Sequence, residues 1–381
     1  MGPIHKKSYL PFCFFSLSFL CACGGGGAES QAPAPVQTQT QTVSYDYTLG
    51  AASSSSAARS NLFNSAASLP YDAPNGASYS SVSAASATLN GSGDPIATVD
   101  TNASTAWSSG WTGKNVSIGV ADGFNSNGRV DSHGDWVSVV ISSVAPEANL
   151  SLRDILNNST LAGLIGDVDA AYTYFENNGI RIINNSWGIE RSIRNSDGSY
   201  SSNLRSDFDS TVNNLVAAYN PNSGTAGQGL YIYAAGNGAQ YCGSTAVADC
   251  NLYAAVTKGI RDSGYSTAGS RLIWVGSLSD GVDTIASYSY GAGDLKYDFI
   301  VAHDDILASG DAAGTSFAAP RVSGAAALVK QKFPNLNSSQ IKQVLLQTAT
   351  DIGAPGVDDV YGYGKLNVVG SLSPQGTVIP R

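Results

Sequence analysis

Short apolar segments alternate with longer segments of helical periodicity from about residue 100 to near the end of this chain. We expect strands at residues 116–121, 150–152, 180–183, 230–233, 272–275 and 299–302, and helices at residues 137–145, 161–175, 204–219, 315–332 and 338–349. Strands that alternate with helices form βαβ units, in which the strands run parallel and the helices cover both faces of the sheet. The pattern therefore predicts a three-layer α/β fold with a mainly parallel sheet.

The first 22 residues have the pattern of a secretory signal. Lys6 and Lys7 precede an apolar run, residues 10–22, which is too short to span a bilayer as a mature helix. The run ends in Leu-Cys-Ala-Cys, which resembles the bacterial lipobox, and the cysteine that matches the lipidated position is Cys23. A lipid on Cys23 would anchor the protein to a membrane surface without spanning the membrane. The alternative is an ordinary signal that is cleaved nearby.

Residues 23–95 are rich in Gly, Ser, Thr, Gln and Ala, so they bury too little apolar area to fold alone. We expect a lipid-anchored, low-complexity linker there, a single domain at residues 96–373 and a tail at residues 374–381. The usual inner-membrane retention residue after the lipidated cysteine is aspartate, and this chain has Gly24 there. We therefore expect an exported, monomeric protein whose anchor lies in the outer membrane.

The charge of the mature chain argues against nucleic acid as a partner. Loss of the signal removes two of the 20 basic residues and none of the 29 acidic ones, which takes the net charge from −9 to −11. Nucleic-acid binding requires the opposite balance.

Cys242 and Cys250 are the two cysteines that follow Cys23. In an exported protein this even remainder predicts a disulfide that closes a short loop, and two free thiols are the alternative.

Polar residues lie at the points where ligands bind in a parallel sheet, beyond the carboxyl ends of the strands. Asp122 ends the first expected strand, and residues 184–188 follow the third. Asn237 follows the strand at 230–233. His133 immediately precedes one helix and Ser316 opens another. These side chains could therefore converge on one cleft.

Ser316 has the surroundings of a nucleophile. Gly314 allows the chain to turn sharply into the helix, and a helix N-terminus offers free N–H groups that favour developing negative charge. Pro320 is expected within about the first turn of the helix, where no intrahelical donor is lost. The alternative is a capped, Ala-rich core helix without chemistry. A serine hydroxyl needs a base, because it is a weak nucleophile until its proton is removed.

The candidates for that base are few, since the chain has three histidines and His5 leaves with the signal. Imidazole suits the task because it both accepts and returns a proton near neutral pH. His133, at a helix start, is favoured over His303, which follows a strand. Asp122 would orient the imidazole, since it ends a core strand, although a simple turn cap is the alternative.

Two further aspartates, Asp131 and Asp135, compete with Asp122 because they lie near the histidine in sequence. Asn237 would supply a side-chain N–H to an oxyanion. The alternative for Asn237 is an asparagine in a Gly-rich turn, where positive φ is tolerated.

Taken together, these motifs resemble those of the subtilisin-like serine peptidases over residues 100–372. The resemblance is carried by the order Asp122, His133, Ser316 and by the segments Gly314–Pro320, Ala235–Asn237, Asn184–Gly188, Ala106–Val116 and Tyr361–Asn367. It implies a subtilisin-like fold and a serine endopeptidase that hydrolyses polypeptides through an acyl-enzyme. Ser186, Trp187 and Gly188 would then form the strand that binds substrate and lines the first pocket. Family members often bind calcium, but we assign no metal site or other cofactor.

The chain departs from the family pattern at several positions. Asp122 is followed by Gly-Phe, and ten residues separate it from His133, fewer than is usual in the family. Asp135 replaces the usual threonine, and Arg321 stands where the family often has histidine. No folded propeptide is evident. These departures leave open a second interpretation, a catalytically weak surface lipoprotein that acts as a binding module. A third, the related family with Glu and Asp in place of His and Asp, is disfavoured by the His133-Gly134 pair.

Overall fold

The computed structural model describes most of the expected domain. The described residues are 45–53, 100–124, 132–156, 160–194, 200–204, 206–218, 228–265, 269–279, 281–304 and 313–374. The expected signal, Cys23, most of the expected linker, Asp131 and the end of the tail lie outside these residues. Predictions that concern them stay predictions.

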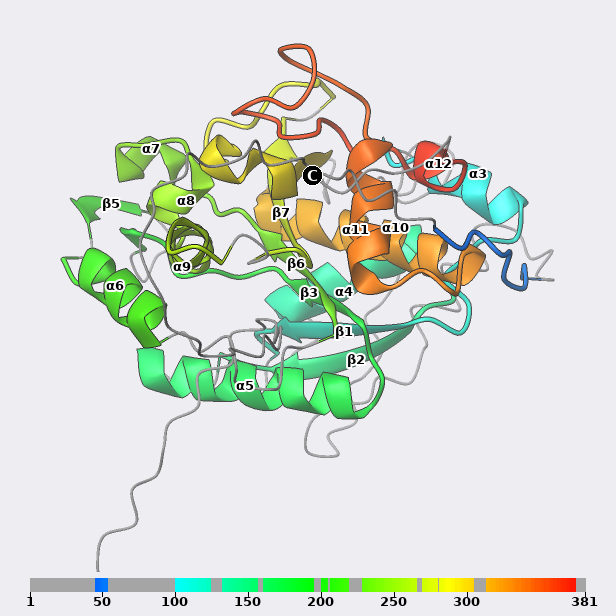
Figure 1. The fold of residues 1–381 in the computed structure, drawn as a ribbon, viewed down its shortest axis with the longest axis horizontal. Coiled ribbons are helices and arrows are strands. Elements are labelled where there is room, and N and C mark those ends of the chain that lie inside the picture. The colour runs from blue at the N-terminus through cyan, green and yellow to red at the C-terminus, as the bar shows by residue number, and fades with distance from the viewer. Residues whose placement is uncertain are drawn as a thin grey trace, which may run out of the picture.

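A six-stranded sheet forms the centre of the molecule, and every strand pair in it is parallel. Its order is β2-β1-β3-β6-β7-β8 (Figure 1). The strands are β1 (Ser117–Asp122), β2 (Asn149–Asp154), β3 (Ile182–Asn185), β6 (Leu230–Ala234), β7 (Leu272–Leu278) and β8 (Phe299–His303). A separate antiparallel hairpin consists of β4 (Ser192–Arg194) and β5 (Tyr200–Leu204). The prediction of a mainly parallel sheet is confirmed.

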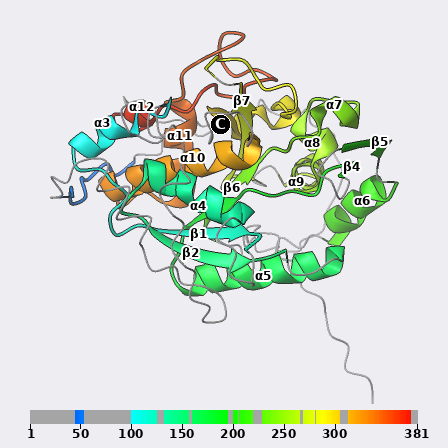
Figure 2. The ribbon, with the colours of Figure 1, turned by 180° about the vertical axis from the view of Figure 1, so that it is seen from behind.

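Helices cover both faces of the sheet because successive strand residues point to opposite sides. Ile232 packs into the core on one face and Tyr231 into the core on the other. The first face carries α3 (Ala103–Ser108), α4 (His133–Val144), α10 (Thr315–Lys332), α11 (Ser338–Gln347) and α12 (Val368–Ser371). The second carries α5 (Leu161–Asn177), α7 (Ala239–Cys242), α8 (Val247–Cys250) and α9 (Leu252–Asp262). Helices α4 and α10 lie behind the strands in Figure 1 and in front of them in Figure 2. The three-layer prediction is therefore confirmed.

Several helices differ from the expectation, and the short helices α3, α7, α8 and α12 were not expected. Helix α4 begins at His133, four residues early, because Ser132 and Asp135 form a reciprocal capping box around its first turn. Helix α6 (Phe208–Ala218) begins late because residues 200–204 pair as β5. Helix α9 was not expected at all. It starts where the side chain of Asn251 accepts hydrogen bonds from the next backbone N–H groups.

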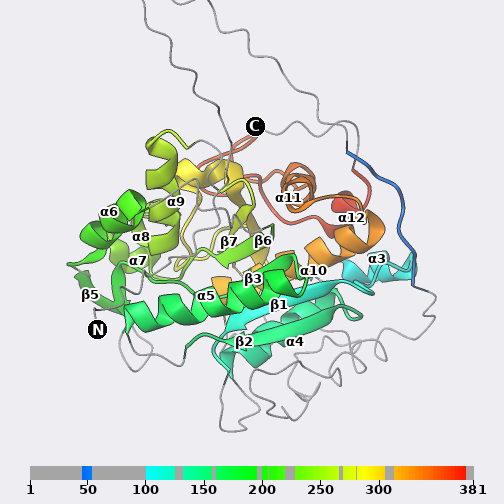
Figure 3. The ribbon, with the colours of Figure 1, turned by 60° about the horizontal axis from the view of Figure 1, so that its bottom comes forward.

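Part of the expected linker is docked on the domain. The backbone N–H of Gly50 donates to the carbonyl of Lys332 at 2.8 Å, and that of Ser53 donates to Gly110 at 2.7 Å. The ring of Tyr47 meets Phe333 edge-on at 5.1 Å. This segment, blue in Figures 1 and 3, runs beside the C-terminal end of α10 and α3. Residues 45–53 therefore pack on the folded domain. Their hydrogen bonds and the Tyr47 ring contact hold a segment whose few apolar residues did not predict packing.

Within the described part of the chain, no helix combines the length and the apolar character needed to cross a membrane.

Candidate active site

Asp122 and His133 are in direct contact at the carboxyl edge of the sheet. Nδ1 of His133 lies 2.7 Å from Oδ1 of Asp122. Asp122 is fully buried at the end of β1, and the same oxygen accepts the N–H of Gly123 at 2.7 Å. The capping box of α4 fixes the backbone that carries the imidazole. The ten-residue separation therefore suffices to bring the two side chains together.

Ser316 lies on the wall of the same cleft. It is the second residue of α10, and its hydroxyl donates to the carbonyl oxygen of Ser186 at 2.9 Å. The imidazole of His133 lies against the next side chain, Phe317, with ring centroids 5.6 Å apart. The serine proton is thus held by the strand that was expected to bind substrate.

Pro320 has a different role from the one expected. It is the sixth residue of α10, deep enough that an ordinary residue there would donate its N–H to the carbonyl of Ser316. Because proline has no N–H, that carbonyl accepts the hydroxyl of Ser186 instead, at 2.7 Å. The expectation that no intrahelical donor is lost was therefore wrong. The proline frees a carbonyl that ties the nucleophile turn to β3's end.

Asn237 is held at its oxygen end. Its Oδ1 accepts the backbone N–H of Thr315 at 2.9 Å and the Thr315 hydroxyl at 3.0 Å. The Thr315 hydroxyl oxygen in turn accepts the N–H of Gly236 at 3.0 Å. This arrangement leaves the nitrogen end of the amide as the end that can donate, on a residue that lines the same cleft as Ser316.

The cleft has a volume of about 580 Å³. Its lining includes every predicted catalytic, oxyanion and substrate-binding residue, namely Asp122, His133, Ser186, Trp187, Gly188, Asn237 and Ser316. Trp187 is 8% exposed and meets the ring of Tyr253 edge-on at 5.4 Å. The structure therefore brings together the seven residues to which the resemblance assigned catalytic, oxyanion and substrate-binding roles.

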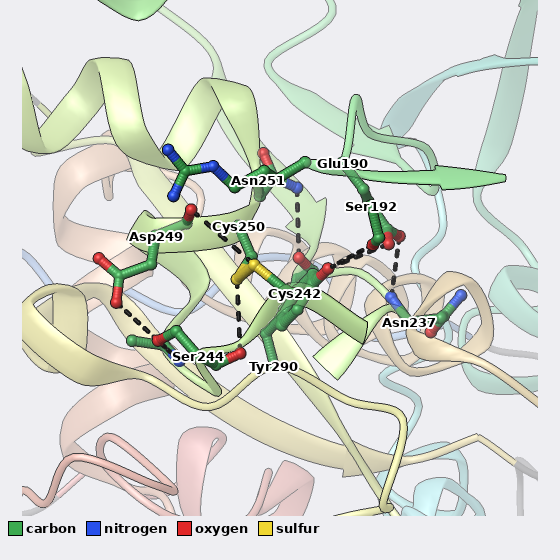
Figure 4. The surroundings of a disulfide bond; sticks show 12 residues. Glu190, Ser192, Asn237, Cys242, Ser244, Asp249, Cys250, Asn251 and Tyr290 are labelled. Atoms are coloured by element: carbon green, nitrogen blue, oxygen red, sulfur yellow. Dashed lines mark hydrogen bonds between the residues drawn. A yellow bond between two sulfur atoms is a disulfide. The ribbon is translucent and has the colours of Figure 1, made fainter. Parts of the chain in front are cut away.

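One wall of the cleft carries a carboxylate that the sequence did not suggest. Oε1 of Glu190 accepts the backbone N–H of Asn237 at 2.9 Å, and Oε2 accepts the Tyr290 hydroxyl at 3.2 Å (Figure 4). A Cβ on Gly238 would lie 2.5 Å from Oε2, so glycine is needed there to admit the carboxylate. Nothing in the local sequence pattern signals this pairing, because the partners come from distant segments.

Cys242 and Cys250 form a disulfide with a Cα–Cα distance of 6.0 Å. Its loop adjoins the substrate side of the cleft, because the carbonyl of Cys250 accepts the N–H of Arg191 at 2.7 Å. A second backbone bond joins the same two segments: the carbonyl of Ile189 accepts the N–H of Leu252 at 2.8 Å. Figure 4 shows the disulfide close to Glu190 and Asn251.

The competing candidates lie elsewhere. Asp135 is buried and accepts bonds from Ser132, so it caps α4. His303 does not line the cleft and lies 3.4 Å from Asp283. Arg321, fully buried, donates to Asp100 at 2.7 Å. Within the described ranges, no group of three or more His, Cys, Asp or Glu side chains could hold a metal ion.

A second buried carboxylate supports the nucleophile turn. Asp304 is fully buried at the end of β8, and its Oδ2 accepts the N–H of Gly314 at 2.6 Å and the hydroxyl of Tyr288. Its place directly after a strand is a signal of the same kind that identified Asp122. The sequence did not reveal its role, because its partners Gly314 and Tyr288 lie 10 and 16 positions away.

Comparison with known proteins identifies the family of this chain. The model of the subtilase family matches residues 90–364, so the chain belongs to the subtilase family. Fervidolysin of Fervidobacterium pennivorans is 29% identical over 287 residues, which are 70% of this chain and 37% of that protein. The Neisserial autotransporter lipoprotein NalP of Neisseria meningitidis is 53% identical over 55 residues, 14% of this chain and 5% of that protein. An extracellular serine protease of Serratia marcescens is 46% identical over 59 residues, 16% and 6% respectively. The chain thus spans well under half the length of these relatives.

Two solved structures are also similar. A lanthipeptide protease has 19% sequence identity and a TM-score of 0.49, with 73% of this chain and 93% of that chain covered. MycP1 from the ESX-1 type VII secretion system has 20% identity and a TM-score of 0.49, with 76% and 90% covered.

Proposed function

We propose that this protein is a serine endopeptidase that hydrolyses polypeptides through an acyl-enzyme. The observation that carries the proposal is the contact between Asp122 and His133 in a cleft that also contains Ser316. Ser316 is the nucleophile, His133 the base and Asp122 the group that orients the base. Membership of the subtilase family supports these roles.

In the proposed reaction, substrate binding releases the serine hydroxyl. An extended peptide that pairs with residues 186–188 presents backbone N–H groups, and these compete with Ser316 for the carbonyl of Ser186. The freed hydroxyl turns to Nε2 of His133. Asp122 accepts a hydrogen bond from the N–H of Nδ1, so Nε2 is the basic nitrogen of the neutral ring. Nε2 takes the proton as Oγ of Ser316 attacks the peptide carbonyl.

The negative charge that develops on the carbonyl oxygen is stabilised by Asn237 and the N-terminus of α10. His133 then returns its proton to the nitrogen of the scissile bond, the C–N bond breaks and an amine leaves. Water attacks the remaining ester with His133 again as base, which restores the Ser316 hydroxyl and releases the acid.

A serine-reactive fluorophosphonate probe tests the proposal on the full chain. Wild type is expected to be labelled and Ser316→Ala is not; equal labelling of both would contradict the assignment. Peptide-library cleavage by wild type beyond that of Ser316→Ala supports the endopeptidase. Its absence from a labelled, folded protein would favour the binding-module interpretation.

We also propose that the protein is exported and held at a membrane by a lipid on Cys23. The signal pattern and the lipobox resemblance support this, as do relatives named as an extracellular protease and a lipoprotein. A clickable palmitate analogue should label the wild-type protein in cells. Cys23→Ala should lose the label and leave the membrane fraction; retention of both would refute the anchor.

A further inference from the structure

A second cavity, of about 550 Å³, lies at the edge of the sheet opposite the catalytic cleft. Its lining includes the first residues of two strands, Ser117 of β1 and Ile182 of β3, and the start of α11. The catalytic cleft lies at the carboxyl ends of the same strands. The lining is Asn115, Val116, Ser117, Gly179, Arg181, Ile182, Gln228, Arg271, Lys330, Leu336, Asn337, Ser338, Ser339 and Ile341.

The charged groups that line this cavity are all cations. Arg181, Arg271 and Lys330 contribute, and no aspartate or glutamate is among the lining residues. Nη1 of Arg181 donates to backbone carbonyls, and Nζ of Lys330 donates to two others, at 2.7 and 2.8 Å. Among the residues that the structure describes, no ion pair joins Arg181 or Lys330 to a carboxylate. Carbonyl groups carry no net charge, so these bonds do not neutralise the two cations.

Three half-buried cations around one cavity repel one another, and burial adds a desolvation cost. That cost is visible at Lys330, whose pKa burial lowers from its usual value. The cluster is conspicuous in a chain with a net charge of −9. An anion with several acceptor oxygens would offset both costs, since arginine pairs with phosphate through two parallel N–H donors. The cavity is also lined by amide and hydroxyl groups, from Gln228 and Ser339 among others, that suit such oxygens.

The docked segment, residues 45–53, lies against the C-terminal end of α10, the end that carries Lys330. Nε2 of Gln331, the residue after Lys330, donates to the carbonyl of Ala51 at 3.2 Å, and Lys332 accepts the N–H of Gly50. Lys330 lies fourteen positions after Ser316 on α10, a helical rise of about 21 Å. Residues 45–53, the described segment nearest to Cys23 in sequence, therefore lie at the end of α10 that carries Lys330, far from the catalytic cleft.

We propose that the cavity lined by Arg181, Arg271 and Lys330 binds a phosphate group. A phosphate-bearing lipid headgroup, at the membrane that the N-terminal anchor reaches, and free inorganic phosphate share this chemistry. When the cavity holds a headgroup, the side of the domain at the amino ends of the strands faces the membrane, and the catalytic cleft faces away from it. The site itself does not depend on the proposed peptidase activity.

Vesicle co-sedimentation and phosphate titration test the site. The protein is the chain from residue 23 onward with Cys23→Ser, so that a lipid anchor contributes nothing. Binding is measured to phosphatidylglycerol–phosphatidylcholine vesicles and to phosphatidylcholine vesicles. Calorimetry measures binding of inorganic phosphate and pyrophosphate. The test variant is Arg181→Gln/Arg271→Gln. The control, Lys258→Gln/Lys296→Gln, removes the same charge from ion pairs outside the cavity.

The test variant is expected to bind at least tenfold more weakly, since each arginine substitution removes a charge-assisted hydrogen bond to the phosphate. The control should bind like the parent. Binding to phosphatidylglycerol vesicles assigns the headgroup as the source, and binding to soluble phosphate alone assigns the free ion. No binding of either, or equal losses in test and control variants, overturns the proposal. Probe labelling of Ser316 in all variants reports the fold and the catalytic cleft independently.

Discussion

Oδ1 of Asn237 accepts two hydrogen bonds from Thr315, one from its backbone N–H and one from its hydroxyl. Thr315 directly precedes Ser316, so the turn that presents the nucleophile also orients the amide beside it. The N–H of Gly236 closes the arrangement by donating to the Thr315 hydroxyl. A single residue, Thr315, thus links the nucleophile to the proposed oxyanion donor.

Thr315→Val is the direct test of this arrangement. Valine keeps the shape and the backbone N–H, but it removes one of the two bonds to Asn237 and leaves Gly236 without its acceptor. The loss of about 1.4 kcal/mol from a buried hydrogen bond corresponds to a roughly tenfold lower kcat. KM should change by less than about threefold. Thr315→Ser keeps the hydroxyl and is expected to stay near wild type; a loss that appears only in KM would argue against positioning.

Asp122→Asn tests the orienting role of the buried carboxylate. An asparagine can offer an N–H to Nδ1 of His133, which stabilises the wrong tautomer and leaves the imidazolium unsupported. We expect kcat to fall by about 10⁴-fold at neutral pH, the size known for such a change in a serine triad. Thermal unfolding of the variant should remain cooperative. Asp359→Asn, at an exposed ion pair with Lys296 outside the cleft, is the control, and comparable losses in both variants would remove Asp122 from its role.

The sequence predicted the layers of the fold because apolar periodicity reports local structure and burial together. It also placed the chemistry at strand ends and helix starts, where Asp122 and Ser316 indeed lie. Such rules depend on chain topology, which the βαβ pattern determines.

Contacts between distant segments were not predictable in the same way. The bonds of Glu190 to Asn237 and Tyr290 join residues 47 and 100 positions apart. The expected helix already began at residue 315, which makes Pro320 its sixth residue. The sequence did not show that the hydroxyl of Ser186, 130 positions before Ser316, would bond to the Ser316 carbonyl that the proline leaves free. The docking of residues 45–53 depends on a surface that exists only after α10 has packed.

Removal of the disulfide should lower stability and disturb the substrate side of the cleft. In the chain-entropy model a bridge across such a short loop contributes about 2–3 kcal/mol. Cys242→Ser/Cys250→Ser should therefore unfold several degrees earlier. Because the carbonyl of Cys250 holds Arg191 beside the substrate strand, KM should rise more than kcat falls. Reduction of wild type should reproduce both effects, and an unchanged melting temperature would show that the bridge is dispensable.

Asp169, on α5, predicts a specific pH dependence of stability. Burial raises the pKa of its carboxyl to about 7, and among the described residues its buried Oδ1 has no hydrogen-bond partner. In the unfolded chain the pKa is near 3.8, the ordinary value. Between these values the folded state holds a proton that the unfolded state has released, so this residue makes stability fall as pH rises from about 4 to 7.

Asp169→Asn removes the titration and keeps the shape of the protonated carboxyl. The variant should melt close to wild type at pH 4 and clearly above it at pH 8. Differential scanning calorimetry of both proteins across this range measures the difference directly. Asp294→Asn, which removes a carboxylate whose side chain is 73% exposed, is the control. If Asp169→Asn changed the melting temperature equally at pH 4 and pH 8, the pKa of Asp169 would not be raised in the folded protein. Burial of its ionised carboxylate would then carry no energetic cost.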